Sequence, residues 1–316
     1  MMTATPTPTS LCVVRQPAKP GTAEWARIIT ASKVAGIAGE SAYETPYSVW
    51  NMLNGIRVED SSMEDRFLTG HAMEHALAYW WAERNPGWRL SRGEVQVQNP
   101  HLGFDNAATL DRVATMVNRS RGPRFSRCVQ FKTVRDWEEF QNLTEETLPV
   151  DWLIQETWEM LCSGLVEHPA VIVVAGPYYE WREFEVPYVA EFAADLVASV
   201  HAFIATLDGH PPTPTAPNDY RIAKLRHPDI DDDADPVSVD ADLAAAWDRA
   251  KTASKDAAAA KRAADKDAEI AGARLLEEMG RAAVAIDPDG HVLAKRVATK
   301  RGVQLRHVPL PKEVAA

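Results

Sequence analysis

The sequence predicts an α/β fold of the α+β type, in which helices flank a mixed central sheet and a C-terminal helical arm with a small hairpin follows. Two observations predict it. Helical and strand patterns alternate between residues 24 and 207, which is typical of a sheet covered by helices. Residues 243–279 are rich in Ala, Lys and Asp with few large apolar residues, which favours an exposed helix over a core element.

A predicted hairpin over residues 109–133 organises the rest of the chain. Residues 109–117 read as one strand and residues 127–133 as the return strand. The polar segment 118–124 between them contains a Gly-Pro pair that suits a chain reversal.

The two strands of this hairpin carry side chains that suit a metal and a phosphate. Alternate residues of a strand share a face, so Gln130 and Lys132 project together while Val129 and Phe131 face the other way. If the strands pair, Asp111 lies close to both polar residues. A carboxylate, an amide oxygen and an ammonium group then converge, and these groups can hold a divalent cation and stabilise phosphate charge.

The remaining elements follow from periodicity and turn residues. Helices are expected at residues 24–38, around Trp50, and at 61–84, 150–162, 189–207 and 243–279. Strands are expected at residues 94–98, 106–117, 127–133, 171–175, 179–186, 283–286 and 291–294.

These elements suggest four segments. Residues 1–20 are Thr/Pro-rich and are expected to be disordered, and residues 21–207 form the core. Residues 208–240, rich in Pro and Asp, read as a linker, and residues 241–316 form the Ala-rich helical arm and a basic hairpin.

Composition narrows the class of protein. The 316 residues carry a net charge of −11, which is not typical of a nucleic-acid-binding protein but is compatible with a local basic groove. Cys12, Cys128 and Cys162 are widely spaced and odd in number, so neither a disulfide framework nor a zinc ribbon is expected. No apolar run approaches the roughly 20 residues of a membrane span. The sequence therefore predicts a cytoplasmic protein.

The helix predicted at residues 61–84 places a carboxylate in an apolar stripe. Phe67, Gly70, Glu74, Leu77 and Trp81 recur at helical spacing and share one face. An unpaired charge in such a stripe is costly. Glu74 therefore binds a metal, a cation or a hydrogen-bond donor, unless it lies at the partly exposed edge of the stripe.

The same helix offers a second interpretation. His71, Glu74 and His75 fit the pattern H-x-x-E-H of inverted zinc peptidases, with two histidines one helical turn apart. A zinc peptidase needs a third ligand further along the chain, and it gives no role to the predicted hairpin.

The order of several motifs resembles the lambda-exonuclease or YqaJ-type viral recombinase family, within the PD-(D/E)xK nucleases. The similarity spans roughly residues 24–205. The residues that carry it are Trp25, Ile29-Thr30-Ala31-Ser32, Gly39-Glu40-Ser41-Ala42-Tyr43, Trp50, Gly70-His71-Ala72-Met73-Glu74, Asp111, Gln130-Phe131-Lys132, Gln155, Met160 and Gly164.

This resemblance implies a PD-(D/E)xK nuclease core and a phage or prophage enzyme acting in the host cytoplasm. It implies an ATP-independent exonuclease that uses Mg²⁺, or Mn²⁺ in its place, to degrade linear double-stranded DNA from 5′ to 3′. Members of the family form ring-shaped trimers and work beside a single-strand annealing protein in homologous recombination. Glu74, Asp111 and Gln130 would surround the metal ions with the main-chain carbonyl of Phe131, and Lys132 would complete the catalytic set.

The resemblance also implies DNA contacts. Ser32 would contact the terminal 5′ phosphate, with a helix-capping serine as the alternative. Gln155 would lie beside the active site near DNA, unless it makes an ordinary hydrogen bond at the edge of the core. Arg27 is a further candidate, although it lies only five residues before Ser32, closer than the family's phosphate-binding arginine.

One departure from the family pattern affects the expected chemistry. Gln130 stands where the family usually has Glu, and an amide coordinates through oxygen without bringing a charge, so a second metal should bind more weakly. A DNA-end-binding recombination factor with little catalysis is therefore the alternative to the exonuclease.

Overall fold

The chain divides into two compact units, Met1–Ile230 and Asp231–Ala316. The computed structural model describes residues 8, 11–19, 21–56, 58, 64–117, 125–300 and 302–309, without the side chains of residues 64–67. The hairpin turn predicted at residues 118–124, the helix start predicted at residue 61 and the side chain of Phe67 lie outside the described part.

The first unit is built on a mixed sheet, as the sequence predicts, and this sheet has five strands. Its strand order is β2-β5-β6-β7-β8, with β6 and β7 parallel and the other neighbours antiparallel. The bounds are β2 (Trp88–Leu90), β5 (Arg112–Met116), β6 (Ser126–Thr133), β7 (Ala170–Ala175) and β8 (Trp181–Val186). A smaller sheet joins β1 (Ile29–Thr30), β4 (Asn106–Leu110) and β3 (Val95–Val97) in the order β1-β4-β3.

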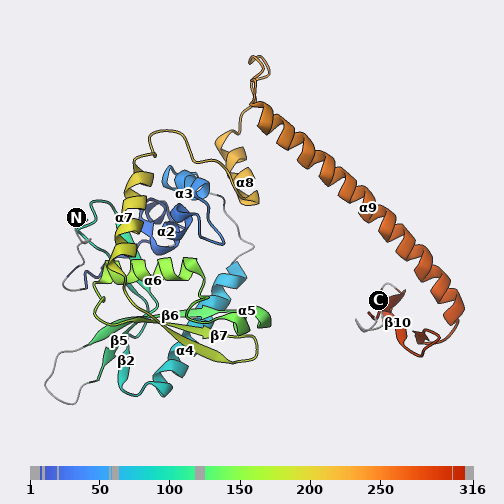
Figure 1. Cartoon of the computed structure of the whole chain (residues 1–316), viewed down its shortest axis with the longest axis horizontal. Coiled ribbons are helices and arrows are strands. Elements are labelled where there is room, and N and C mark those ends of the chain that lie inside the picture. The colour runs from blue at the N-terminus through green and yellow to red at the C-terminus, as the bar shows by residue number, and fades with distance from the viewer. Residues whose placement is uncertain are drawn as a thin grey trace. The chain divides into compact units, whose positions relative to one another are not determined.

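Helices cover both faces of the large sheet (Figure 1). The described helices of this unit are α1 (Ala23–Arg27), α2 (Ala31–Ala38), α3 (Pro46–Leu53), α4 (Glu64–Arg84), α5 (Trp137–Asn142), α6 (Val150–Ser163), α7 (Ala190–Ile204) and α8 (Pro217–Arg226). Helix α4 lies on one side of the sheet and α6 on the other, with α2 and α7 packed beyond α6 (Figure 1).

The alternation along β6 explains this sandwich of layers. Val129 and Phe131 are buried in one cluster with Leu77 and Trp81 of α4. Cys128 belongs to the larger cluster on the α6 side. Because strand residues alternate between faces, the α6 side of β6 also carries Gln130 and Lys132. The predicted segregation of apolar and polar residues on this strand is therefore confirmed.

The predicted pairing of the hairpin strands is confirmed, but the first strand is not continuous. β4 belongs to the small sheet and β5 to the large one, and Asp111 lies at the bend between them. Pairing of β5 with β6 runs from Thr115 opposite Ser126 to Arg112 opposite Val129. The prediction of a single strand over residues 106–117 was wrong, because the chain passes from the small sheet to the large one at Asp111.

Other segments also differ from the sequence-based expectation. Strand β2 and helix α5 were not predicted. The helix expected at residues 24–38 is interrupted by β1, whose β-branched residues pair in parallel with β4. Within the segment expected to be disordered, Val13 bridges to Val97 and the N–H of Val14 donates to the carbonyl of Gln96. Residues 208–240 contain α8, whose buried Asp219 accepts a hydrogen bond from Thr45 Oγ1 at 2.8 Å.

The second unit contains one long helix and a three-stranded antiparallel sheet. Helix α9 (Ala241–Met279) precedes β9 (Val284–Ile286), β10 (Val292–Thr299) and β11 (Gly302–His307), in the order β11-β10-β9. The third strand was not predicted. A small core of Met279, Ala285 and Ala294 anchors the sheet to the end of the helix.

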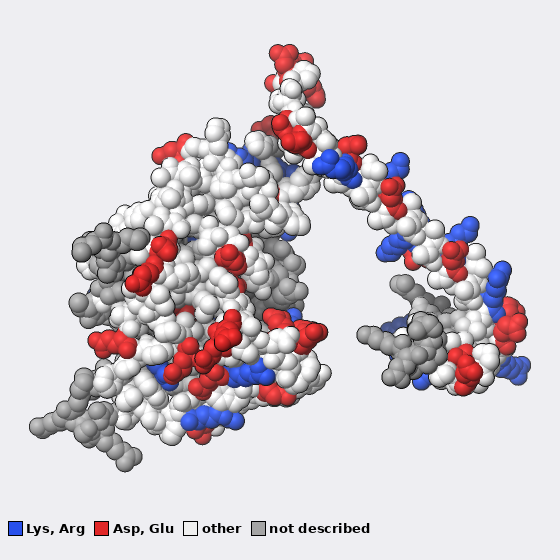
Figure 2. Space-filling model, in the orientation of Figure 1, with Lys and Arg blue, Asp and Glu red and all other residues white. Residues whose placement is uncertain are grey.

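Charge is distributed differently over the two units. Lys and Arg alternate with Asp and Glu along α9, as expected of a solvated helix (Figure 2). On the visible face of the first unit, acidic side chains gather over the region of β7, β8 and α5 (Figure 2). Within the described residues, none of the helices combines the length and the apolar character that a bilayer crossing requires.

Candidate metal-binding and catalytic site

The candidate site forms around Asp111, at the junction between β4 of the small sheet and β5 of the large sheet. Pairing of β5 with β6 ends at Arg112 and Val129, so β5 offers no carbonyl to the N–H of Phe131. The Asp111 carboxylate accepts that N–H instead, with 2.7 Å between Oδ2 and the nitrogen. The hydrogen bond holds the carboxylate, which is only 8% exposed, against the strand that carries Gln130 and Lys132.

Gln130 and Lys132 project from β6 toward α6, and only the Lys132 side chain meets a hydrogen-bond acceptor there. The Gln130 side chain is 5% exposed, and its Oε1 has no hydrogen-bond partner in the described part of the protein. The Lys132 ammonium donates to Gln155 Oε1 at 2.7 Å. A buried amide oxygen without a donor is an unusual feature, and a bound cation would satisfy it.

Helix α6 contributes two carboxylates that the sequence analysis missed. Glu156 and Glu159 are 0% and 1% exposed. Both oxygens of Glu156 and one oxygen of Glu159 lack a hydrogen-bond partner among the described residues. The signal was present in the sequence, because Gln155, Glu156 and Glu159 are polar residues at i, i+1 and i+4 among the large apolar residues of a helix that packs on the sheet.

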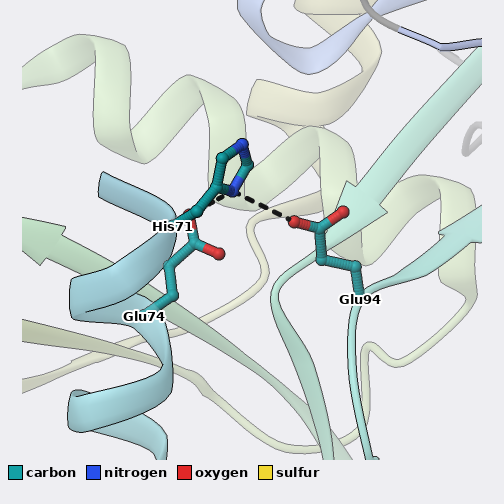
Figure 3. Close-up of side chains that lie close together, drawn as sticks. All are labelled: His71, Glu74 and Glu94. Atoms are coloured by element: carbon teal, nitrogen blue, oxygen red, sulfur yellow. Dashed lines mark ion pairs between the residues drawn. The ribbon is translucent and has the colours of Figure 1, made fainter. Parts of the chain in front are cut away.

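Helix α4 supplies the carboxylate of Glu74, beside His71 and Glu94 (Figure 3). His71 Nδ1 lies 3.5 Å from Glu74 Oε1 and 3.6 Å from Glu94 Oε1. Glu94 comes from the loop immediately before β3, so this group joins two separate elements (Figure 3). The ligand atoms of the three residues are within 4.8 Å of one another, which is close enough for one cation. The sequence analysis did not single out Glu94.

The structure does not assemble the zinc-peptidase ligand pair. His71 faces the two glutamates, whereas His75 Nδ1 lies 3.4 Å from Arg112 Nη2. Among the described residues, the potential metal-binding groups of His, Cys and acidic side chains do not include His75. The other such group, Asp287, Asp289 and His291, lies in the β9–β10 turn of the second unit, where backbone N–H groups occupy the Asp287 carboxylate.

Burial and like charge dominate the electrostatics of the site. Burial raises the pKa of Asp111 to about 7, against the lowering effect of the Phe131 N–H, and the negative charges of Glu74 and Glu94 add to the increase. Burial likewise raises the pKa of Glu156 to about 8, although Lys132 acts in the opposite direction. Burial and the neighbouring Glu156 raise the pKa of Glu159 well above its usual range. A cation bound among these carboxyl groups would favour their charged forms and lower their pKa values.

The donor set suits a hard divalent cation. Asp111 and Glu74 offer carboxylate oxygens, although among the described residues Glu74 groups closely with His71 and Glu94 and not with Asp111. Gln130 offers an unpartnered amide oxygen, and the Phe131 carbonyl lies on the same strand. Mg²⁺ and Mn²⁺ prefer such oxygen ligands, and none of the buried thiols of this chain is part of the group.

The predicted DNA-contacting residues have diverse surroundings. Gln155 lies beside Lys132, and its amide also donates to Glu159. Ser32 is exposed in the first turn of α2, 3.2 Å from Thr30 Oγ1. Thr30 is the N-cap residue of α2, so the interpretation of Ser32 as the helix cap is wrong. Arg27 is an exposed residue at the end of α1.

Comparisons with known proteins give structural neighbours only. No protein-family model and no curated relative matches the chain. An alkaline exonuclease, LHK-Exo, from Laribacter hongkongensis aligns with a TM-score of 0.44 and 17% identity, over 66% of this chain and 97% of the exonuclease. The structure of LHK-Exo in complex with dAMP aligns with a TM-score of 0.46 and 15% identity, over 65% and 95% of the two chains. At these identities and TM-scores, the alignments assign neither a family nor an activity.

Proposed function

We propose that the first unit is a divalent-metal-dependent deoxyribonuclease of the PD-(D/E)xK type that acts on the ends of linear double-stranded DNA. One observation carries this proposal. The hydrogen bond from the Phe131 N–H holds the Asp111 carboxylate against the strand that carries Gln130 and Lys132, and the positive charge of Lys132 acts on the Asp111 carboxyl. Glu74 is close enough for its charge to affect the Asp111 carboxyl.

The residues divide the work of phosphodiester hydrolysis among them. Asp111, Glu74, Gln130 Oε1 and the Phe131 carbonyl would hold Mg²⁺ or Mn²⁺. Such an ion supplies positive charge to the scissile phosphate and lowers the pKa of water. Lys132 stabilises the negative charge that develops on the phosphoryl oxygens and orients the attacking water, while Gln155 fixes the position of its ammonium group.

The finer features are those of the family that the sequence resembles. We propose digestion from 5′ to 3′ without ATP, contacts of Ser32 and Arg27 with the terminal phosphate, a ring-shaped homotrimer, and action with a single-strand annealing protein in recombination in the host cytoplasm. The first unit would form the nuclease core, and the second unit would be an appended arm.

Gln130 favours a second candidate function, a DNA-end-binding recombination factor with little catalysis. A neutral amide at this position leaves the metal site with one carboxylate fewer than the family pattern provides, and weaker metal binding would reduce turnover without removing DNA affinity.

The test is digestion of linear duplex DNA with 5′-phosphate or 5′-hydroxyl ends in Mg²⁺ and in Mn²⁺. The wild-type protein should remove one strand, faster from phosphorylated ends, and Lys132→Ala should lose at least about a hundredfold in rate. Lys224→Ala, at an exposed lysine of α8, is the matched control and should retain full activity. Binding of DNA ends without cleavage in either metal would replace the nuclease with the end-binding factor, and absence of both activities would overturn the proposal.

A further inference from the structure

Lys132 lies at the end of a short, partly buried chain of hydrogen bonds. Its Nζ donates to Gln155 Oε1 at 2.7 Å, and Gln155 Nε2 donates to Glu159 Oε1 at 2.9 Å. Gln155 and Glu159 lie four residues apart on α6, so their side chains are neighbours on one helical face. Glu159 is 1% exposed and therefore has a fixed place in the core.

The direction of this chain is determined by the chemistry of its two ends. A lysine ammonium has no acceptor, so the atom of Gln155 that faces it must be the amide oxygen. The amide nitrogen then faces Glu159, whose carboxyl oxygen Oε1 accepts in either protonation state. If residue 159 offered no acceptor, Gln155 would lose the partner that keeps its amide from rotating, and a rotated amide would present its nitrogen to Lys132.

We propose that Glu159 is a positioning residue that acts on Lys132 through Gln155. It fixes the orientation of the Gln155 amide, and the amide oxygen in turn holds the Lys132 ammonium where the scissile phosphate would bind. This inference rests on the proposed nuclease function for its effect on turnover, but the hydrogen-bond chain itself exists without substrate. It also gives a buried carboxylate a role, where an apolar side chain would fill the core at lower cost.

Because of this chain of hydrogen bonds, the donor or acceptor that residue 155 offers must match the one that residue 159 offers. Glu159→Met has similar length but no acceptor, so Lys132 loses its fixed partner, whereas Glu159→Gln retains an oxygen that can accept from Gln155. Gln155→Glu places two carboxyl groups face to face and removes the amide N–H that donates to Glu159. Combining Gln155→Glu with Glu159→Gln restores one donor and one acceptor, with a carboxylate now facing Lys132.

The experiment has two parts. The first measures kcat and KM on linear duplex DNA. The second uses mass spectrometry to follow the rate at which an N-hydroxysuccinimide ester acetylates Lys132 in the absence of metal and DNA. Glu159→Met and Gln155→Glu should each lower kcat by about 10- to 100-fold, with a smaller change in KM. Glu159→Gln should stay within about threefold of wild type, and the double variant should recover at least about tenfold over Gln155→Glu. Lys132 should be acetylated faster in Glu159→Met than in wild type.

Thr157→Val is the matched control, because Thr157 is buried on another side of the same helix. It should change neither kcat nor the acetylation rate, and thermal melts should show that all variants fold. The proposal is overturned if folded Glu159→Met has the wild-type kcat and acetylation rate, or if the double variant is no better than Gln155→Glu. If the wild-type protein cleaves no DNA, the nuclease proposal fails, and the acetylation rates alone still decide whether Glu159 positions Lys132.

Discussion

Replacing Asp111 with Asn should make the metal-free protein more stable at alkaline pH. The pKa of the buried Asp111 carboxyl rises from 3.8 to about 7, chiefly because burial penalises its charged form. Each pKa unit corresponds to about 1.4 kcal/mol, so ionised Asp111 lowers the free energy of unfolding by on the order of 4 kcal/mol above pH 7. Asn removes the charge and keeps an oxygen for the Phe131 N–H.

The sign of the pH dependence follows from the two pKa values. The contribution of the protonated carboxyl to stability is complete below pH 3.8, because both the folded and the unfolded states are then protonated. Between pH 3.8 and about 7 the unfolded chain releases its proton while the folded state retains it, so the free energy of unfolding falls until the folded group ionises. The advantage of Asp111→Asn should therefore grow by about 2–3 kcal/mol between pH 5 and pH 8.

The assay is chemical or thermal denaturation in EDTA at both pH values. For a unit of this size, a difference of 2–3 kcal/mol corresponds to roughly 5–10 °C in Tm. Adding Mg²⁺ should stabilise the wild type more than Asp111→Asn, because the variant offers a neutral amide oxygen where the wild type offers a charged carboxylate. Asp195→Asn, at an exposed position of α7, is the control. An advantage of Asp111→Asn that does not grow with pH would refute the role assigned to burial, and equal stabilisation by Mg²⁺ would refute the role of Asp111 as ligand.

Three further predictions concern the metal, the thiols and the core. Gln130→Glu adds a charged oxygen to the site, so isothermal titration should show at least about tenfold tighter Mg²⁺ binding, and unchanged affinity would exclude Gln130 as a ligand. Burial raises the pKa of the Cys128 and Cys162 thiols, so a thiol reagent should modify at most one of the three cysteines, Cys12, in the native protein and all three in denaturant. Rapid reaction of two or more native thiols would contradict this. Leu77→Ala on α4 should lower the free energy of unfolding by about 2–5 kcal/mol, because Leu77 is fully buried. Leu68→Ala, at a 70% exposed position of the same helix, should change it by less than about 0.5 kcal/mol. Similar effects of the two variants would contradict the burial of this face of α4.

Local pattern in the sequence predicted which side chains of β6 share a face. Alternation along residues 127–133 placed Gln130 and Lys132 on one face and Val129 and Phe131 on the other, and the structure shows this arrangement. The apolar stripe predicted on α4 is confirmed at Leu77 and Trp81, which are fully buried, whereas the Glu74 side chain is 22% exposed and lies at the partly exposed edge of the stripe. Helical and strand periodicities persist through packing because they follow from backbone geometry alone.

The helix and linker boundaries that the sequence predicted wrongly depend on contacts between segments distant in the sequence. Residues 29 and 30 leave the expected helix because they pair with β4, which is distant in sequence. The α8 helix in the predicted linker is held by Asp219, which accepts a hydrogen bond from Thr45. Such contacts have no periodic signal in the sequence, because each requires two segments to meet in space.

The sequence by itself determined the layered α/β arrangement and the polar face of β6. Only the tertiary structure decided which groups surround that face: Asp111 where the chain changes sheets, Glu159 behind Gln155, and Glu94 opposite His71. The physical reason is that the surroundings of a charged side chain depend on what packs against it. Glu156 and Glu159 read as ordinary helix formers in the sequence, and they become buried carboxylates only when α6 packs on the sheet.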